Sequence, residues 1–167
     1  PEVIKTVTNE EVSFEDLGGA TTHGSKSGVS HFTADCDEDA INLARDLVSI
    51  LPTNNMEKPP TKNTTDSKNR SCDLLDSIVP DDPAKPYDVK DVIAEILDDG
   101  GFMEVQEGWA ANIVVGFGHL GGHTVGVVAN QPKILAGCLD IDASDKAARF
   151  VRFCDAFNIP IITLEDV

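Results

Sequence analysis

The sequence predicts an α/β fold in which a β-sheet packs against helices. Two β-rich runs, 109–118 and 124–130, flank a Gly-Gly pair and predict an antiparallel hairpin. A helical pattern reaching Phe157 follows, and then an apolar segment over 160–164. Strand, helix and strand in this order are typical of a βαβ unit. An amphipathic pattern over 38–51 predicts a further helix.

The composition is that of one globular domain with a strongly acidic surface. The 167 residues are 41% apolar and 25% charged, and 13 basic against 29 acidic side chains give a net charge of −16. Such a field repels nucleic acid and anionic membranes, so we expect neither as a partner. No apolar run reaches the roughly 18 residues of a membrane-spanning helix, and we expect no membrane insertion.

The cysteines and the chain ends complete these global features. The cysteines are Cys36, Cys72, Cys138 and Cys154. They stand singly with no CxxC spacing, which indicates reduced thiols in a reducing compartment and no structural zinc site. The chain starts at Pro1 and stops just after an apolar run, so we interpret it as a piece of a larger polypeptide.

The first part of the chain is expected to form short helices. Residues 2–8 fit one or two helical turns. Ser13 and Asp16 have the spacing of a capping box, which opens a second short helix that ends at the glycine pair 18–19. A glycine-rich loop is then expected over 17–32.

The helix over 38–51 is the strongest helical pattern in the chain. Asp35 or Asp37 is expected to cap it, and Pro52 stops it. Its expected inward residues are Ala40, Ile41, Ala44, Leu47, Val48 and Leu51.

A linker rich in Asn, Thr, Lys and Pro is expected over 53–86, with one short helical turn at 74–79. Regular structure resumes with a helix over 88–98, capped by Asp88, and a strand over 102–105. The apolar stripe of that helix is Val89, Val92, Ile93, Ile96 and Leu97.

The last helix is expected to begin at Ser144 or Asp145 and to run to Phe157, with Asn158 as a left-handed stop before the strand 160–164. Its expected inward residues are Ala147, Phe150, Val151, Cys154 and Phe157.

The segment 17–32 is the main candidate for function. It holds four glycines, two histidines and several hydroxyl side chains with almost no apolar periodicity. Glycine at this density lets backbone N–H groups approach a ligand closely, although an ordinary surface loop has the same composition. Backbone donors of this kind suit reactions that need an oxyanion hole.

Other candidates for chemistry are weaker. His119 and His123 have the spacing of metal ligands on a helix, but they flank a turn, and we expect no metal site there. Asp140, Asp142 and Asp145 are explained by helix capping.

A nucleophile and its base are also conceivable in the glycine-rich loop. Ser27 with His23 or His31 has the right residue types, but no third, orienting group can be named. The P-loop, the dinucleotide-binding fingerprint and the GxSxG motif do not occur.

Several stretches together resemble the carboxyltransferase subunit of biotin-dependent acyl-CoA carboxylases. Within that family they are most similar to the branch of propionyl-CoA carboxylase β, the transcarboxylase large subunit and methylmalonyl-CoA decarboxylase α. The stretches are Pro1–Thr8, Leu17–Ala20, His23–Gly24, Ser27–Phe32, Leu51–Asn55, Ile78–Pro80, Lys85–Asp88, Val127–Pro132 and Gly137–Phe157.

The resemblance implies a crotonase-like (ClpP/crotonase) α/β carboxyltransferase fold. Residues 1–80 are expected to be the end of its N-terminal half, and residues 81–167 the start of its C-terminal half. In this family a carboxyl group moves between N1′ of biotin and the α-carbon of an acyl-CoA, here propionyl-CoA or methylmalonyl-CoA. Backbone oxyanion holes stabilise the enolates, and the transfer step uses no metal.

The resemblance also implies partners and a location. Biotin is carried on a biotin carrier domain or subunit, a biotin carboxylase is the further partner, and the full-length protein is a homo-oligomer, a hexamer. The location is the cytoplasm of a bacterium or, in a eukaryote, the mitochondrial matrix.

The site residues that carry over lie in the glycine-rich loop, and their implied role is to line the pocket and to make backbone contacts. They are Gly19, Ala20, Thr22, His23, Gly28, Ser30 and His31. No residue of this chain is expected to be catalytic, because the oxyanion-hole pairs are implied to lie outside it. The isolated chain is therefore expected to be inactive.

Three residues depart from the family pattern. His119 and His123 stand where arginine is common, and Glu165 stands where an apolar residue is usual, which would bury a charge if Glu165 lies in the strand. Two other functions stay open. The chain can be a non-catalytic assembly fragment, or a crotonase-like acyl-CoA hydratase or hydrolase, which needs an acid–base carboxylate that the loop between Asp16 and Asp35 lacks.

Overall fold

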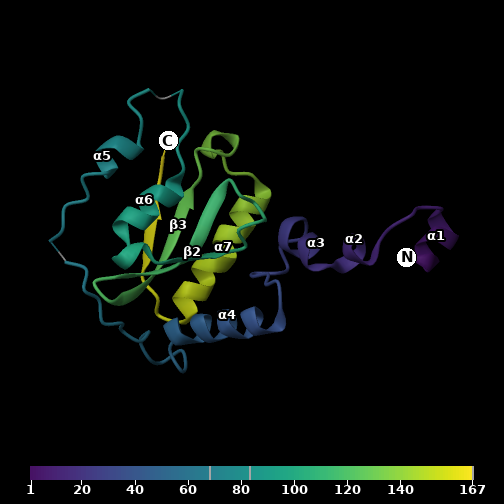
Figure 1. Ribbon diagram of the computed structural model, residues 1–167, viewed down its shortest axis with the longest axis horizontal. Helices are drawn as coiled ribbons and strands as arrows, with labels where there is room; N and C mark the ends of the chain where they lie inside the picture. Colours follow the sequence, from purple (N-terminus) through teal and green to yellow (C-terminus); the bar gives the residue numbers. More distant parts are fainter. Residues whose placement is uncertain (68, 83, 167) are drawn as a thin grey trace.

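A mixed β-sheet with helices on both faces positions the rest of the molecule (Figure 1). The computed structural model describes residues 1–67, 69–82 and 84–166. In these ranges the sheet has the order β1-β2-β3-β4, formed by Phe102–Val105, Ile113–Leu120, His123–Asn130 and Ile161–Leu164. Strands β1 to β3 are antiparallel neighbours, and β4 lies parallel to β3. The predicted hairpin and βαβ unit are both confirmed.

The hairpin turn depends on two glycines and one carboxylate. Gly121 and Gly122 have φ angles of 58° and 81°, as the tight turn between β2 and β3 requires. The side chain of Asp98 accepts hydrogen bonds from both N–H groups, at 2.9 Å and 2.7 Å. Strand β2 begins at Ile113 and not at Trp109 as expected, because the chain around Ala110 turns through a φ of 47°.

Each face of the sheet has its own hydrophobic core. Helix α7 (Ile141–Ala156) packs on one face through Phe150 and Cys154. Helix α6 (Val89–Ile96) packs on the other through Val89 and Ile93. The β2 residues alternate between the two cores: Ile113, Val115 and Phe117 face α7, and Val114 faces α6.

Helix α7 starts earlier than the sequence suggested. Its N-cap is Asp140, whose carboxylate accepts the N–H of Ala143 at 2.9 Å. The expected caps, Ser144 and Asp145, therefore lie inside the helix. Val151 was expected to face inward but is 40% exposed. Lys146, which is not among the expected inward residues, is fully buried. Asn158 has a φ of 57° and ends the helical segment as expected.

The buried residues of helix α4 (Asp37–Ile50) differ from those expected from the sequence. Its N-cap is Cys36 with no side-chain cap, so neither expected aspartate caps it. The core contact runs through its C-terminal end, at Leu47, Ile50 and Leu51. Only that end reaches the sheet, so four residues expected inside are exposed: Ala40, Ile41, Ala44 and Val48.

The N-terminal helices extend away from the α/β body (Figure 1). They are α1 (Glu2–Thr8), α2 (Phe14–Gly18) and α3 (Ala20–Ser25). The capping box is confirmed, because the Ser13 hydroxyl accepts the Asp16 N–H and the Asp16 carboxylate accepts the Ser13 N–H. The expected loop over 17–32 was wrong in one respect: its middle forms α3.

The remaining elements are short. Helix α5 spans Leu75–Ile78, and two 3₁₀ turns span Asp98–Gly100 and Leu135–Gly137. Helix α6 and β1 have the bounds expected within one or two residues. Glu165 is exposed and lies beyond β4, so it buries no charge. In the parts of the chain that the structure describes, no helix is both long and apolar enough to cross a bilayer.

Candidate functional site

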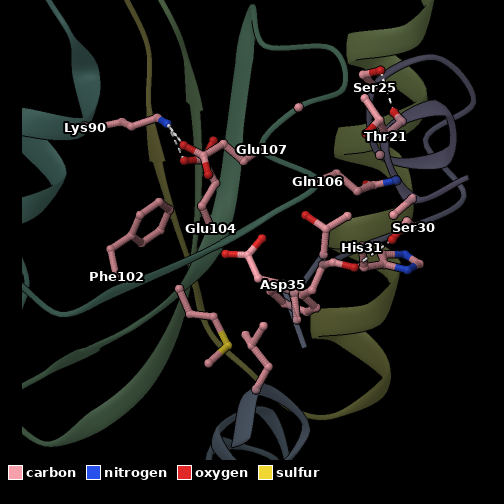
Figure 2. Close-up of a pocket in the computed structure, with 18 residues that line it drawn as sticks. Thr21, Ser25, Ser30, His31, Asp35, Lys90, Phe102, Glu104, Gln106 and Glu107 are labelled. Atoms are coloured by element: carbon pink, nitrogen blue, oxygen red, sulfur yellow. Dashed lines mark hydrogen bonds and ion pairs between the residues drawn. The ribbon is translucent and has the colours of Figure 1, made fainter. Parts of the chain in front are cut away.

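A cavity of about 1010 Å³ lies between the glycine-rich segment and the β1 edge of the sheet (Figure 2). One wall comes from residues 20–35, and the opposite wall comes from residues 102–108. Leu43 of α4 and Lys90 of α6 complete the lining. The segment singled out in the sequence is thus one wall of a real pocket, and β1 with the loop after it forms the other.

The structure divides the predicted site residues into two groups. Ala20, Ser30 and His31 line the cavity. The others do not line it, and they are Gly19, Thr22, His23 and Gly28. Thr22 instead fastens the segment to α2, since its hydroxyl donates to the carbonyl oxygen of Glu15 at 2.8 Å.

Gly28 supports the wall from behind. Its φ of +61° lies in the left-handed region that favours glycine. A Cβ atom at this position would stand 2.3 Å from Cδ2 of Trp109, so only glycine lets the indole ring approach. The side chain of Gln106 donates a hydrogen bond to the Gly28 carbonyl oxygen.

Most backbone N–H groups of the segment are already used. The N–H groups that donate to an acceptor within residues 13–30 belong to Leu17, Gly19, Thr21, His23, Lys26, Ser27, Val29 and Ser30. The segment therefore does not present a row of free donors, as its glycine content had suggested. His31 and Phe32 both line the cavity, and within residues 1–67, 69–82 and 84–166 their N–H groups donate no hydrogen bond.

Charged side chains of the opposite wall were missed by the sequence reasoning. Lys90 Nζ lies 2.5 Å from Glu104 Oε2 and 2.9 Å from Glu107 Oε1 (Figure 2). Burial acts to lower the pKa of Lys90, but hydrogen bonds to Glu104 and Glu107 outweigh it and raise that pKa. Asp35 also lines the cavity. No local motif links these residues, because the fold brings them together from three separate stretches.

The possible nucleophile–base pair does form a contact. His23 Nδ1 lies 2.9 Å from Ser27 Oγ, on the exposed side of α3. For the residues described, no carboxylate hydrogen-bonds to the His23 ring, so the orienting group of a catalytic triad is missing there. His31 does not take part in this contact.

The two hairpin histidines lie on different strands, His119 in β2 and His123 in β3. His119 pairs across the strands with Thr124, and His123 pairs with Leu120. Burial lowers the pKa of His119, nearby Lys62 lowers it further, and Asp98 opposes them. Over the described ranges no group of three or more His, Cys, Asp or Glu side chains is placed to hold a metal ion.

Comparison with known proteins places the chain in a family. The model of the carboxyl transferase domain matches residues 1–167. The carboxyltransferase subunit of propionyl-CoA carboxylase from Haloferax mediterranei is 59% identical over the whole chain. The methylmalonyl-CoA decarboxylase α subunit from Veillonella parvula is 54% identical, again over the whole chain. The chain spans about a third of the length of these curated relatives, 32% and 33% respectively.

Solved structures agree with the sequence match. The crystal structure of transcarboxylase 12S, a hexamer with methylmalonyl-coenzyme A and methylmalonic acid bound, superposes with a TM-score of 0.94 at 50% identity. The match covers 100% of this chain and 32% of the transcarboxylase chain. The sheet and its helices thus have the crotonase-like carboxyltransferase fold that the resemblance implied. The chain belongs to the carboxyl transferase domain family.

Proposed function

We propose that the full-length polypeptide containing this chain transfers a carboxyl group between N1′ of biotin and the α-carbon of an acyl-CoA. Propionyl-CoA and methylmalonyl-CoA are the proposed substrates. The observation that carries the proposal is the identity of 54–59% to relatives named for these two acyl-CoA reactions, which extends over the whole chain. The bound methylmalonyl-coenzyme A of transcarboxylase 12S supports the same substrate class.

The cavity between residues 20–35 and 102–108 is the proposed contribution of this chain to the active site. Its volume of about 1010 Å³ is within the range of small-molecule sites and leaves room for the ureido ring of biotin beside a thioester. The N–H groups of His31 and Phe32 are donors suited to a ureido or thioester carbonyl oxygen, whereas the Ser30 hydroxyl already donates to the Phe32 carbonyl oxygen at 2.7 Å. Biotin, when bound, carries the carboxyl group that is transferred.

The residues of this chain act by shape and by fixed dipoles. We assign Ala20, Ser30 and His31 to contact with the ligands. Gly19, Thr22, His23 and Gly28 hold the wall in place. A donor fixed by the fold stabilises developing negative charge without reorganising during the reaction. The glycine pairs of the oxyanion holes are proposed to lie in the rest of the polypeptide, so the isolated chain is expected to be inactive.

The oligomeric state and the partners of the full-length polypeptide are inferred from the same family. We propose a homo-hexamer that receives biotin from a carrier domain or subunit and works with a biotin carboxylase. Support comes from the hexamer assembly of transcarboxylase 12S. We further propose that residues 1–80 end one crotonase-like half and that residues 81–167 start the next.

An assay of the full-length polypeptide tests the proposed activity. Methylmalonyl-CoA is supplied with and without free biotin, and loss of its carboxyl group is followed. We expect decarboxylation that depends on biotin. Equal rates with and without biotin would contradict the proposal, and a polypeptide with no activity in any assay would favour a non-catalytic assembly role.

One observation favours a second function, an acyl-CoA hydratase or hydrolase. The loop itself lacks a carboxylate, but the cavity does not, because Asp35, Glu104 and Glu107 line it. An acid–base carboxylate is what such enzymes need. Against this function, Lys90 pairs with both glutamates. Hydration of an enoyl-CoA without any effect on biotin would establish this alternative.

A further inference from the structure

A fully buried lysine lies behind the cavity wall. Lys146 comes from the middle of α7 and has 0% of its surface exposed. Its Nζ donates to three carbonyl oxygens at 2.8–2.9 Å, those of Gln106, Trp109 and Ile113. The carbonyl oxygen of Ala110 lies 3.4 Å away. One side chain thus contacts four carbonyl groups, three from the loop between β1 and β2 and one from the first residue of β2.

That loop has a conformation that needs support. Gln106 and Ala110 have φ angles of 55° and 47°, in the left-handed region that residues other than glycine rarely occupy. The two turns aim the carbonyl oxygens at one point, and the ammonium group of Lys146 occupies it. Such strained residues persist only where the surroundings over-determine them. Lys146 supplies that constraint.

The opposite side of the loop contacts the glycine-rich segment. The backbone N–H of Gln106 donates to the His31 carbonyl oxygen at 2.9 Å, and its side chain donates to the Gly28 carbonyl oxygen. A Cβ atom at Gly108 would stand 2.9 Å from the carbonyl oxygen of Gly24. Gln106 and Gly108 both line the cavity. A shift of the loop therefore moves both walls.

We propose that Lys146 is a positioning residue, which fixes the loop 106–113 through its carbonyl groups and thereby sets the distance between the two walls of the cavity. Lys146 lines no part of the cavity itself. The inference deepens the proposed carboxyl transfer, and only its effect on turnover rests on that function. Its structural part stands on the contacts alone.

Nearby charges only partly offset the effect of burial on Lys146. Burial lowers the pKa of Lys146 to about 8, while Glu104 of β1 and Glu107 of the loop raise it and Lys90 of α6 lowers it. If the loop opens, the ammonium group regains water and its ordinary, higher pKa.

Hydrogen exchange of the full-length polypeptide tests the proposal directly. The amides of Gln106 and Trp109 report the loop, and those of β3 serve as an internal reference. We compare wild type with Lys146→Met, which keeps the volume and removes the donors, and with Lys146→Arg, which keeps the charge. The matched control is Arg152→Met, an exposed position on the same helix.

We expect Lys146→Met to lower loop protection at least tenfold with β3 unchanged, and Lys146→Arg to restore part of it. The kcat of Lys146→Met for carboxyl transfer is expected to fall at least tenfold, whereas the kcat of Arg152→Met stays within twofold of wild type. Loop protection unchanged within twofold in a folded Lys146→Met would overturn the proposal. Should that variant fail to fold, the wild type decides: amides of Gln106 and Trp109 that exchange as fast as unprotected amides would also overturn it. Reduced loop protection in Lys146→Met, together with a wild-type polypeptide that has no carboxyl transfer activity, would contradict only the proposed function.

Discussion

Gly28 lies directly against the indole ring of Trp109. A Cβ atom on Gly28 would stand 2.3 Å from Cδ2 and 2.4 Å from Cε3 of that ring, closer than any real contact. This contact joins the glycine-rich segment to the loop after β1, two parts of the chain that are about eighty residues apart. The candidate site depends on that junction, because each partner carries one wall of the cavity.

Gly28→Ala is therefore expected to destabilise the protein. The left-handed φ of +61° costs an L-residue about 1–2 kcal/mol, and the added methyl group overpacks the ring by about 1–3 kcal/mol. We expect the free energy of unfolding to fall by about 2–5 kcal/mol in urea titrations of the full-length polypeptide. Gly24→Ala is the control, since its Cβ would lie 3.3 Å from Thr33 Cγ2 in a helical backbone. A smaller loss for Gly28→Ala than for Gly24→Ala would refute the junction.

The carboxylate of Asp98 is expected to stabilise the β2–β3 turn in a pH-dependent way. Burial acts to raise the pKa of Asp98, but hydrogen bonds from Gly122 and Gly121 outweigh it and lower that pKa. A lowered pKa means stability that is present above the unfolded value near 3.9 and is lost as the pH falls through the folded value.

Asp98→Asn keeps the shape and removes the charge. At pH 7 we expect it to cost about 1.5–3 kcal/mol in the free energy of unfolding, the size of a hydrogen bond to a charged group. The difference from wild type should shrink steadily below pH 4. Unfolding measured at pH 7 and pH 3 checks this, and an equal difference at both values would contradict it.

Lys90 is expected to hold the two glutamates of the cavity wall by its charge. The pKa of Lys90 is raised, so its contribution to stability is present below its unfolded pKa near 10.4 and is lost above the folded value. Because its side chain is 35% exposed, solvent screening limits the effect of Lys90→Met to about 1 kcal/mol near neutral pH. The same substitution at Lys133, which is 60% exposed, is the control. A loss for Lys90→Met that persists above pH 11 would argue for packing alone.

His23 and Ser27 are expected to have no chemical role despite their 2.9 Å contact. Removal of a true nucleophile or base reduces kcat by about 10⁴-fold or more. We expect His23→Ala and Ser27→Ala, singly or together, to reduce kcat of the full-length enzyme less than about tenfold, because their contact only joins α3 to the residues that follow it. Steady-state kinetics decide the matter. A loss in either single variant as large as in the double variant, and beyond a thousandfold, would establish a nucleophile–base pair.

Local sequence patterns predicted most of the sheet and its helices. The β-rich run 109–118, the Gly121-Gly122 turn and the cap at Asp88 each depend on near neighbours, and the structure has the turn, the cap and a strand that begins at Ile113 within that run. The errors arose where distant contacts decide. The buried face of α4 is set by which end meets the sheet, so Ile41 and Val48 are exposed. The start of α7 moved because Asp140 competes successfully with Ser144 as the cap.

Only one of the two walls of the cavity could be predicted from the sequence. Glycine density and the resemblance to carboxyltransferases pointed to residues 17–32, and Ala20, Ser30 and His31 do line the cavity. The opposite wall carried no sequence signal, since Glu104 and Gln106 belong to an ordinary strand and loop. Lys146 was invisible for the same reason: nothing near it along α7 indicates that four carbonyl groups from residues 106–113 surround it.

A crystal structure of the full-length polypeptide with biotin and methylmalonyl-CoA bound tests the central claim most directly. The account predicts that both ligands lie in the cavity and approach within about 4 Å of Ala20, Ser30 or His31, the distance of van der Waals contact. Ligands that bind elsewhere, with the space between residues 20–35 and 102–108 filled only by solvent, would contradict it.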